Sequence, residues 1–346
     1  SYSGATSSSK DVAVTGKYID AIVLEDALDG SGGLASNYQL PSLDALNAPV
    51  VIDAKTVNLS ASRIYDGSEI LSGTDVSIST GITGETLGYS GATVSSKDVA
   101  VSDKFIDAIV LENAIDGSGG LASNYQLPSL NVSNAPVSIS TKEVGLSASR
   151  IYDGSKILSG ADVSITTGVG VETLSYSGGS ASSKDVVVSG KYIDAIVLED
   201  GLDGSGGLAS NYHLPSLDAL NAPVTISQKM VGLSASKIYD TGVGLAGYVE
   251  LSTGVGAETL SYSGATSSSK DVAESGKYIN AITLEDALDG SGGLASNYQL
   301  PSLNALSAPV IINAKTVNLS ASRIYDGSEI LSGTDVSIST GITGET

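Results

Sequence analysis

Cysteine is absent from the chain, tryptophan is absent too, and histidine, phenylalanine and methionine occur once each. Without cysteine the protein has no disulfide, no thiolate metal site and no cysteine nucleophile. One histidine excludes zinc sites that need several. Any hydrophobic core must therefore come from valine, isoleucine, leucine, alanine and the 16 tyrosines. The one histidine, His213, stands where the other copies have glutamine and so cannot be the catalyst of a repeated unit; we expect no enzymatic activity, no catalytic residues and no obligatory cofactor.

Positive charge is also scarce, because 17 basic residues stand against 38 acidic ones and give a net charge of -21. Nucleic acids and anionic membrane surfaces attract lysine and arginine, so neither is expected as a partner. No apolar run approaches the roughly 20 residues that span a bilayer, and we expect no direct membrane insertion. Charged residues make up only 16% of the chain and apolar ones 41%. That balance favours folded domains over an acidic disordered tail.

The chain consists of four copies of one unit. The triplet Tyr-Ser-Gly recurs about every 87 residues, beginning at Tyr2, Tyr89, Tyr176 and Tyr262. The segment 54–86 returns residue for residue as 314–346. A unit of this length exceeds a solenoid coil of roughly 20–45 residues, but it suits a small domain with its own core. We therefore expect a string of domains whose partners are neighbouring repeats of the same chain.

Each unit has the pattern of short strands. Val76 and Ile78 alternate with serines, which is typical of a half-buried strand. The pair Ser102-Asp103 separates the apolar runs 98–101 and 104–111, and a two-residue turn of this kind predicts a hairpin of those two runs. The residues 111–115 are compatible with one helical turn. The sequence thus predicts an all-β chain, a tandem array of small Ig-like β-sandwich domains, with β-grasp-like domains carrying one short helical turn as the alternative.

An Ala-Pro pair follows a loop in every copy and suggests the domain borders, because proline favours the start of a strand over a helix. The strand after each proline closes one domain or opens the next. The predicted divisions are a partial β domain at 1–49, whole repeats at 50–136, 137–223 and 224–309, and a partial β domain at 310–346. The first residue is not methionine, so we expect the chain to be cut from a longer array. Alternatively, the partial ends complete each other between copies and give head-to-tail filaments.

The order of short motifs is similar to a known family. Arg63 to Gly67 reads Arg-Ile-Tyr-Asp-Gly, Leu71-Ser72-Gly73 follows, then Lys97-Asp98-Val99, and then Asn124-Tyr125. This ordered set, at a fixed period, resembles the YDG domain over essentially the whole chain. The resemblance implies tandem repeats of very large secreted bacterial proteins, many of them similar to filamentous haemagglutinins and other surface adhesins. It implies no catalytic residues.

An acidic, glycine-rich loop follows the predicted hairpin in each copy. Calcium takes six to eight oxygen ligands, and the carboxylates, a serine hydroxyl and glycine carbonyls of the loop offer several. The candidate calcium ligands are Asp26, Asp29, Asp116, Asp203, Asp286 and Asp289. The alternative is a simple turn in which the aspartate accepts hydrogen bonds from backbone amides.

Other recurring residues have a structural and a functional interpretation. Tyr38 and Tyr65, with their equivalents, either pack in the core and between domains or stack on a ligand. His213 stands where other copies have glutamine, so we interpret it as a surface substitution. Lys17, Lys104, Lys191 and Lys277 lie in a predicted turn, so we expect no lysine–asparagine crosslink.

These observations predict a structural stalk or filament region of a secreted or surface-attached bacterial adhesin. The alternatives are an adhesive module that binds a surface glycan or protein, and a filament subunit that assembles head-to-tail.

Overall fold

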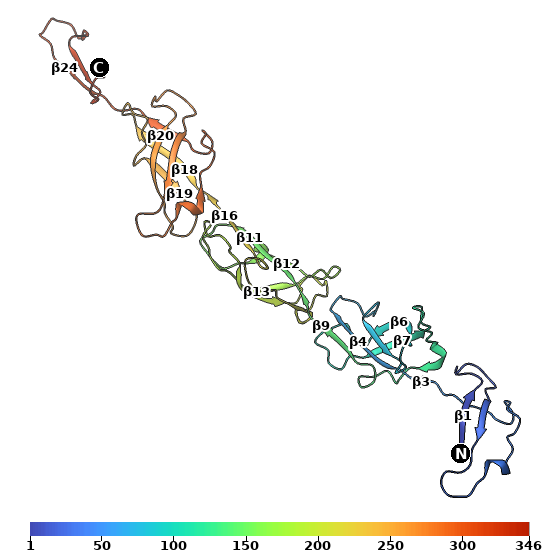
Figure 1. Cartoon of the computed structure of the whole chain (residues 1–346). Coiled ribbons are helices and arrows are strands. Elements are labelled where there is room, and N and C mark those ends of the chain that lie inside the picture. Colours follow the sequence, from blue (N-terminus) through green and yellow to red (C-terminus); the bar gives the residue numbers. More distant parts are fainter. Residues whose placement is uncertain (346) are drawn as a thin grey trace. The chain divides into compact units, whose positions relative to one another are not determined.

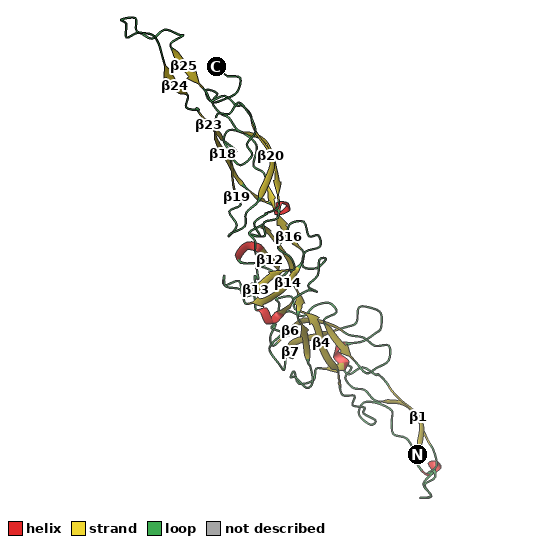
Figure 2. Ribbon diagram, turned by 90° about the vertical axis from the view of Figure 1, so that its left-hand side faces the viewer, coloured by secondary structure: helices red, strands yellow, loops and turns green. Residues whose placement is uncertain are grey.

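The computed structural model describes residues 1–345, which form strands, loops and short 3-10 turns without any α-helix (Figure 2). The predicted all-β fold is therefore confirmed. Within these residues no helix is long and apolar enough to cross a bilayer. The chain divides into two compact units. Unit 1 comprises 1–144, 167–174 and 199–213, and unit 2 comprises 145–166, 175–198 and the described residues from 214 onward.

Unit 1 contains one complete repeat (Figure 1). Its first sheet has β4 (Asn58–Ile64) in the middle, with β5 (Val76–Ser79) antiparallel on one side and β9 (Val137–Ser140) parallel on the other. A hairpin of β6 (Gly88–Val94) and β7 (Ile106–Glu112) makes the second sheet. Alternate residues of β4 are buried, as the serine-apolar alternation demands.

Short elements complete unit 1. The parallel pairs are β3 (Lys55–Thr56) with β8 (Tyr125–Gln126), and β10 (Lys142–Glu143) with β15 (Tyr212–His213). The 3-10 turns are η1 (Ala35–Asn37), η2 (Ala122–Asn124) and η4 (Ala209–Asn211). A separate hairpin of β1 (Tyr2–Ser7) and β2 (Ile19–Leu24) corresponds to β6 and β7 of the complete repeat.

Unit 2 has the same topology twice. One three-stranded sheet has β11 (Gly145–Ile151) between β12 (Val163–Thr166) and β16 (Val224–Ser227). The other has β18 (Gly232–Ile238) between β19 (Val249–Ser252) and β23 (Val310–Asn313). Its hairpins are β13 (Ser175–Ala181) with β14 (Ile193–Glu199), β20 (Ser261–Ser267) with β21 (Ile279–Glu285), and β24 (Asn318–Ala321) with β25 (Val336–Ser339). The short elements are η3 (Gly160–Asp162), η5 (Ala295–Asn297), and β17 (Lys229–Met230) paired with β22 (Tyr298–Gln299).

The core of each repeat joins its two sheets. In unit 2, Leu233 and Ala235 of β18 share one buried cluster with Ile279 and Ile282 of β21 and with Val310 of β23. Burial of these aliphatic side chains supplies the main driving force for the domain.

Two local expectations were wrong. Residues 98–101 form a turn and not a strand, and the hairpin partner of β7 is β6. The reason is Lys104, whose ammonium donates hydrogen bonds to the carbonyls of Asp98, Val99 and Val101, so those groups cannot pair in a ladder. The helical turn over 111–115 does not form either, because β7 continues to Glu112 and the next side chain, Asn113, accepts a hydrogen bond from the Ala122 amide (2.8 Å).

The strand that follows each Ala-Pro dipeptide belongs to the sheet of the preceding strands, in the same repeat. β9 follows Pro136 and pairs with β4, so the sheet of this repeat continues past the border expected at 136 and ends near Thr141. The segments 167–174 and 199–213 come later in the sequence than this sheet, yet they belong to the same compact unit. Two loops of one repeat are thus part of the fold of the repeat before it.

Candidate functional site at the joint between repeats

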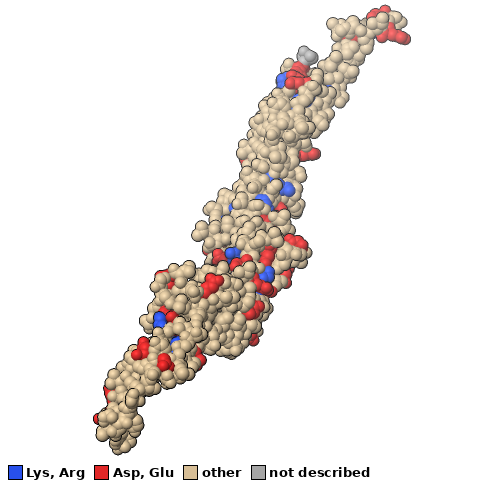
Figure 3. Space-filling view, turned by 90° about the vertical axis from the view of Figure 1, so that its right-hand side faces the viewer, with Lys and Arg blue, Asp and Glu red and all other residues tan. Residues whose placement is uncertain are grey.

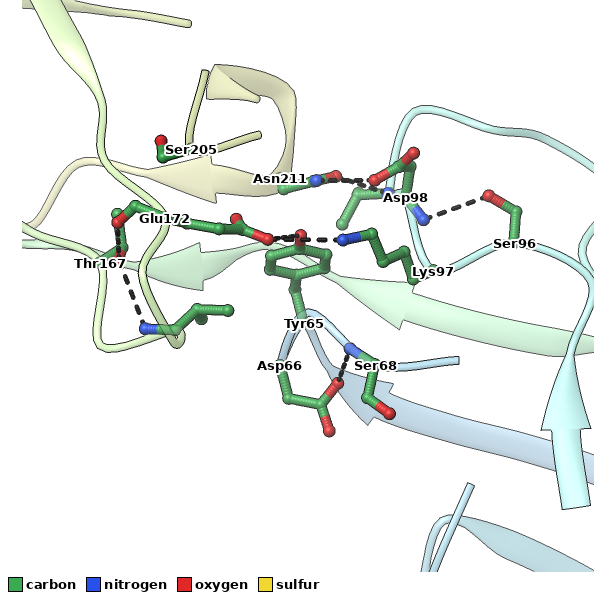
Figure 4. A network of polar contacts seen from close by, with 12 residues as sticks. Tyr65, Asp66, Ser68, Ser96, Lys97, Asp98, Thr167, Glu172, Ser205 and Asn211 are labelled. Atoms are coloured by element: carbon green, nitrogen blue, oxygen red, sulfur yellow. Dashed lines mark hydrogen bonds and ion pairs between the residues drawn. The ribbon is translucent and has the colours of Figure 1, made fainter. Parts of the chain in front are cut away.

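The joint in unit 1 begins at the end of β4. Tyr65 follows this strand, and its amide donates a hydrogen bond to the carbonyl of Ser140 (2.9 Å). The chain then turns, because Asp66 accepts the Ser68 amide (2.9 Å) and Gly67 has a φ of 81°. Tyr65 is thereby fixed as the last residue before a tight turn, with its side chain directed at the two loops of the following repeat (Figure 4).

Glu172 lies at the centre of the joint. Its loop is closed by a hydrogen bond from the Thr167 hydroxyl to the Glu172 carbonyl (2.8 Å). The carboxylate accepts a hydrogen bond from the Tyr65 hydroxyl (2.8 Å), and the Lys97 ammonium lies 3.5 Å away (Figure 4). It also accepts a hydrogen bond from the Tyr212 hydroxyl (2.7 Å). A largely buried carboxylate is thus held by two neutral donors and one cation, which offsets the cost of removing it from water.

The two tyrosine rings contact each other edge to face. The ring centroids of Tyr65 and Tyr212 are 5.4 Å apart at an interplanar angle of 79°. Both side chains are buried. Burial is the main cause that raises the pKa of each hydroxyl, and the hydrogen bond to Glu172 raises it further. Both hydroxyls therefore stay protonated and remain donors at neutral pH.

Asn211 makes a second polar contact beside the tyrosines. This fully buried side chain accepts a hydrogen bond from the Val99 amide (2.8 Å) and donates one to Asp98 (2.9 Å). Both ends of the amide are satisfied, so its burial is not penalised, and a mispositioned loop would leave it unpaired. Asn211 therefore sets the register of the joint.

The glycine of the Tyr-Asp-Gly triplet is required by a close approach. A Cβ atom at Gly67 would lie 2.5 Å from Cγ1 of Val169, in the loop that carries Glu172. The positive φ adds a second reason for glycine. The triplet is thus the point at which one repeat receives the next.

The same arrangement recurs within unit 2. Glu258 accepts hydrogen bonds from the hydroxyls of Tyr152 (2.8 Å) and Tyr298 (2.6 Å) and from Lys184 (3.1 Å). The tyrosine centroids are again 5.4 Å apart at 79°. Burial favours a higher pKa for Glu258, but the hydrogen bonds from Tyr298, Tyr152 and Lys184 outweigh it and lower the pKa. Asn297 repeats the role of Asn211.

Two partial versions of the joint are present. In unit 1, Glu85 accepts a hydrogen bond from Tyr125 (2.6 Å) and lies 3.5 Å from Lys10, but no residue takes the place of Tyr65. In unit 2, Glu345 accepts one from Tyr239 (2.6 Å), and none of the residues 1–345 takes the place of Tyr212. Each partial joint thus has one tyrosine where the complete joint has two.

The candidate calcium ligands bond residues of the protein itself, either in the same acidic loop or in the loop that carries the joint glutamate. Asp116, Asp203 and Asp289 each accept a threonine hydroxyl and a serine amide. The threonine bond is the main cause that lowers the pKa of each carboxyl to about 2. Asp29 accepts the Ser31 amide. Within 1–345, no group of three or more acidic or histidine side chains is placed to hold a metal. Calcium binding stays a prediction.

A further position in the acidic loop accepts a backbone amide in every copy, including one residue that the sequence did not point to. Asp26 and Asp286 accept the amides of Ala35 and Ala295, and Asn113 does the same for Ala122. Asp200, which was not among the candidate ligands, accepts the Ala209 amide at the equivalent place. Because Asn113 makes the same contact as the aspartates, a neutral side-chain oxygen is sufficient to accept this hydrogen bond, and a negative charge is not required.

The single histidine and the recurring lysines make contacts within the protein. His213 lies on β15, where its Nδ1 is 2.9 Å from the Thr141 hydroxyl. The recurring lysines at 17, 104, 191 and 277 are buried and bond backbone carbonyls of their own loops.

The joint carboxylate and the asparagine beside the tyrosine were not among the site residues expected from the sequence. A signal existed, because glutamate precedes threonine at 85, 172, 258 and 345, and asparagine precedes tyrosine in every copy. No family model, no curated protein and no solved structure matches the chain. The resemblance to the YDG domain therefore stays a prediction.

Proposed function

We propose that the chain is a structural stalk or filament region of a secreted or surface-attached bacterial protein, in which each repeat locks onto the next. In this proposal the repeats are Ig-like β domains of the YDG kind, they carry no catalysis, and their role is to hold a binding or anchoring region away from the cell. The observation that carries the proposal is the joint, which occurs complete around Glu172 and again around Glu258.

The chemistry of the joint suits a mechanical connection. Its tyrosines and asparagine are buried, and every polar atom described above has a partner. Buried polar contacts of this type tolerate little displacement, since a shift of one loop would leave a carboxylate or an amide unpaired. A ligand site would instead be a pocket in which a few polar groups remain open to bind and orient the ligand.

The surface is compatible with a long array of similar domains. On the face shown in Figure 3, acidic side chains are scattered among large uncharged areas, and basic ones are few. Net negative charge keeps near-identical repeats soluble. It also discourages pairing between exposed strands such as β5, whose outer edge has no partner strand.

Small-angle X-ray scattering of the whole chain tests the proposal. A compact protein of this length would have a radius of gyration of about 20 Å. A stalk predicts a value well above that, and the compact value would contradict it. Glu258→Gln should increase the flexibility seen in the scattering curve, because the variant loosens one joint. The surface variant Glu250→Gln, on β19, makes the same change of charge and serves as control.

Adhesive binding is the second candidate, and one observation favours it. The tip of the acidic loop carries an apolar side chain that is exposed in all four copies, at Leu28, Ile115, Leu202 and Leu288. A repeated exposed apolar residue offers a contact for a glycan or protein partner. A glycan array and a cell-binding assay test this, and a chain that combines Leu28→Ser, Ile115→Ser, Leu202→Ser and Leu288→Ser should lose any binding. Unchanged binding would remove these loops from consideration.

A further inference from the structure

The two sheets of the complete repeat in unit 1 separate along one side, between β5 and β6. Among the strands, β5 pairs only with β4 and β6 only with β7, so an edge of each sheet borders this opening. A cavity of about 640 Å³ lies there, lined among others by Leu71, Val76, Ile78, Leu87 and Tyr89. Ligand pockets commonly have volumes of roughly 300–1,000 Å³. This opening, which we call the edge groove, is therefore large enough for a small ligand.

The edge groove is a property of the repeat itself. Ile78, Leu87 and Tyr89 are half-buried in unit 1. The equivalent residues in the two repeats of unit 2 are half-buried as well, and they are Ile165, Leu174, Tyr176, Leu251, Leu260 and Tyr262. The packing around the groove is thus the same in each whole repeat.

Backbone groups of β5 face the edge groove. The Ser62 amide donates a hydrogen bond to the Asp75 carbonyl (2.9 Å), which fixes how β5 pairs with β4. Bonded residues alternate along an antiparallel pair, so the backbone of Ser77 points to β4, and the amide and carbonyl of Ile78 point to the outer edge. A ligand that carries both donors and acceptors can pair with these two groups.

Tyr89 bounds one end of the edge groove. It lies on β6, and its hydroxyl donates a hydrogen bond to the carbonyl of Gly73, in the turn before β5 (3.0 Å). Tyr176 makes the same contact with Gly160 (3.1 Å). Burial is the main cause that raises the pKa of the Tyr89 hydroxyl, so the hydroxyl keeps its proton and remains a donor. The aromatic ring is therefore fixed between the two sheets.

The lining of the edge groove is neutral and mixed in polarity. None of the described residues that line it is charged. Besides the apolar residues, the lining contains Ser72, Ser90 and three glycines. A neutral saccharide matches such a lining, because its rings carry hydroxyl groups and apolar C–H groups side by side.

An extended peptide fits the edge groove less well. A peptide that adds to a sheet needs an edge along which its chain can run. β5 has only four residues, and the segment 80–87 connects it directly to β6 at one end. At the other end, the Tyr89 side chain reaches across to Gly73. The groove is thus bounded at both ends and suits a short ligand.

We propose that the edge groove of each whole repeat binds a short neutral saccharide. The Tyr89 ring contacts an apolar face of a sugar, and sugar hydroxyls pair with the backbone of Ile78 and with Ser90. The inference goes beyond the proposed stalk, because the groove is separate from the joint. It also lies apart from the loop tips considered above for adhesive binding.

The third repeat differs at the edge groove. Its turn before β19 is one residue shorter and has Ala246 in place of Ser72. The Tyr262 hydroxyl accepts the amides of Gly247 (2.8 Å) and Val249 (3.2 Å). The third repeat therefore offers one hydroxyl fewer, and we expect it to bind the saccharide more weakly than the other two.

Isothermal titration calorimetry of the whole chain tests the inference. The probes are the linear tetrasaccharides of glucose, mannose, galactose and N-acetylglucosamine. At least one of them should bind with a Kd below about 1 mM. A blocking variant places tryptophan at the rim of the groove in each whole repeat, with Ser90→Trp, Ser177→Trp and Ser263→Trp combined. These serines are exposed, so the fold should remain, and the Kd should rise at least about tenfold.

The matched control combines Ser62→Trp, Ser149→Trp and Ser236→Trp. These serines are also exposed, but they lie on the middle strands β4, β11 and β18, and the control should bind like the unaltered chain. A gentler variant combines Tyr89→Phe, Tyr176→Phe and Tyr262→Phe. It keeps the rings but removes the hydrogen bonds that fix them, and it should raise the Kd by about threefold. This variant decides the question if the blocking variant fails to fold.

Four results would overturn the inference. They are no binding of any of the four tetrasaccharides, equal weakening in both tryptophan variants, unchanged binding in the phenylalanine variant, and binding of the capped neutral peptide Thr-Val-Thr-Val-Thr in place of a saccharide. Saccharide binding that survives the blocking variant but is lost in the loop-tip serine variant would place the ligand at the loops and also refute the groove. If no saccharide binds while the scattering is that of an extended chain, the proposed stalk stands and only the groove fails.

Discussion

Replacing Glu258 by glutamine removes the charge at the centre of one joint and leaves its shape nearly unchanged. The carboxylate accepts hydrogen bonds from Tyr152 and Tyr298 and pairs with Lys184. Hydrogen bonds to a charged acceptor contribute about 1.5–3 kcal/mol, against about 0.5–1.5 kcal/mol for neutral pairs. Weakening two such bonds costs about 2 kcal/mol, and the partly exposed lysine adds at most about 1 kcal/mol.

Differential scanning calorimetry measures this loss. A destabilisation of about 2–3 kcal/mol should lower the transition of the repeats that meet at this joint by on the order of 10 °C. Glu250→Gln, which removes an exposed charge on β19, should leave the transition nearly unchanged. Equal shifts in both variants would refute the reasoning, because the effect would then follow net charge and not the joint.

The pH dependence gives an independent check on Glu258. Its hydrogen bonds lower its pKa from the ordinary value of 4.5, despite the opposing effect of burial. The stabilisation is therefore present above about pH 4.5 and is lost as the pH falls through the lowered pKa. The difference in melting temperature between the two chains should shrink at acid pH. A constant difference at all pH values would contradict the role of the charge.

At alkaline pH the stability of the joint depends on whether the tyrosine hydroxyls keep their protons. Burial first, and then Glu258, raises the pKa of Tyr298 above its ordinary value of 10.0. The folded state thus favours the protonated form of the Tyr298 hydroxyl. The stabilisation of the folded state by this hydroxyl is present below about pH 10 and is lost as the pH rises further. The joint should be most stable between these two limits.

Three further predictions concern the same repeats. Gly154→Ala should destabilise the joint by about 1–3 kcal/mol more than Gly117→Ala, because both glycines have a φ of 83° but only the Cβ at Gly154 would meet Val255, at 2.7 Å. Equal melting temperatures in the two variants would disprove the close approach. Thr241→Gly should stabilise the third repeat by about 1 kcal/mol, since this β-branched residue has a φ of 68°, and calorimetry would detect a shift of either sign. A chelator should leave the melting temperature unchanged, because the aspartates of the acidic loops already bond a serine of the same loop and a threonine of the neighbouring loop; a drop of several degrees would instead reveal a bound cation.

The sequence by itself determined the repeat and the class of fold. The period is visible in identical triplets, and the alternation of serine with Val76 and Ile78 encodes a half-buried strand that the structure contains as β5. Both are local signals, since a strand of period two must turn alternate residues to the same face. The scarcity of other large aromatics favoured packing contacts for the tyrosines but left ligand stacking open as the alternative.

The connections between distant residues were decided only in the tertiary structure. The parallel pairing of β4 with β9 and the contact of Tyr65 with Glu172 join segments that no short pattern links. Lys104 shows the same limit locally. The apolar run 98–101 has the pattern of a strand, but its carbonyls bind the lysine ammonium and form a turn. Whether a backbone group pairs with a strand or with a side chain depends on which partner the whole fold brings within reach.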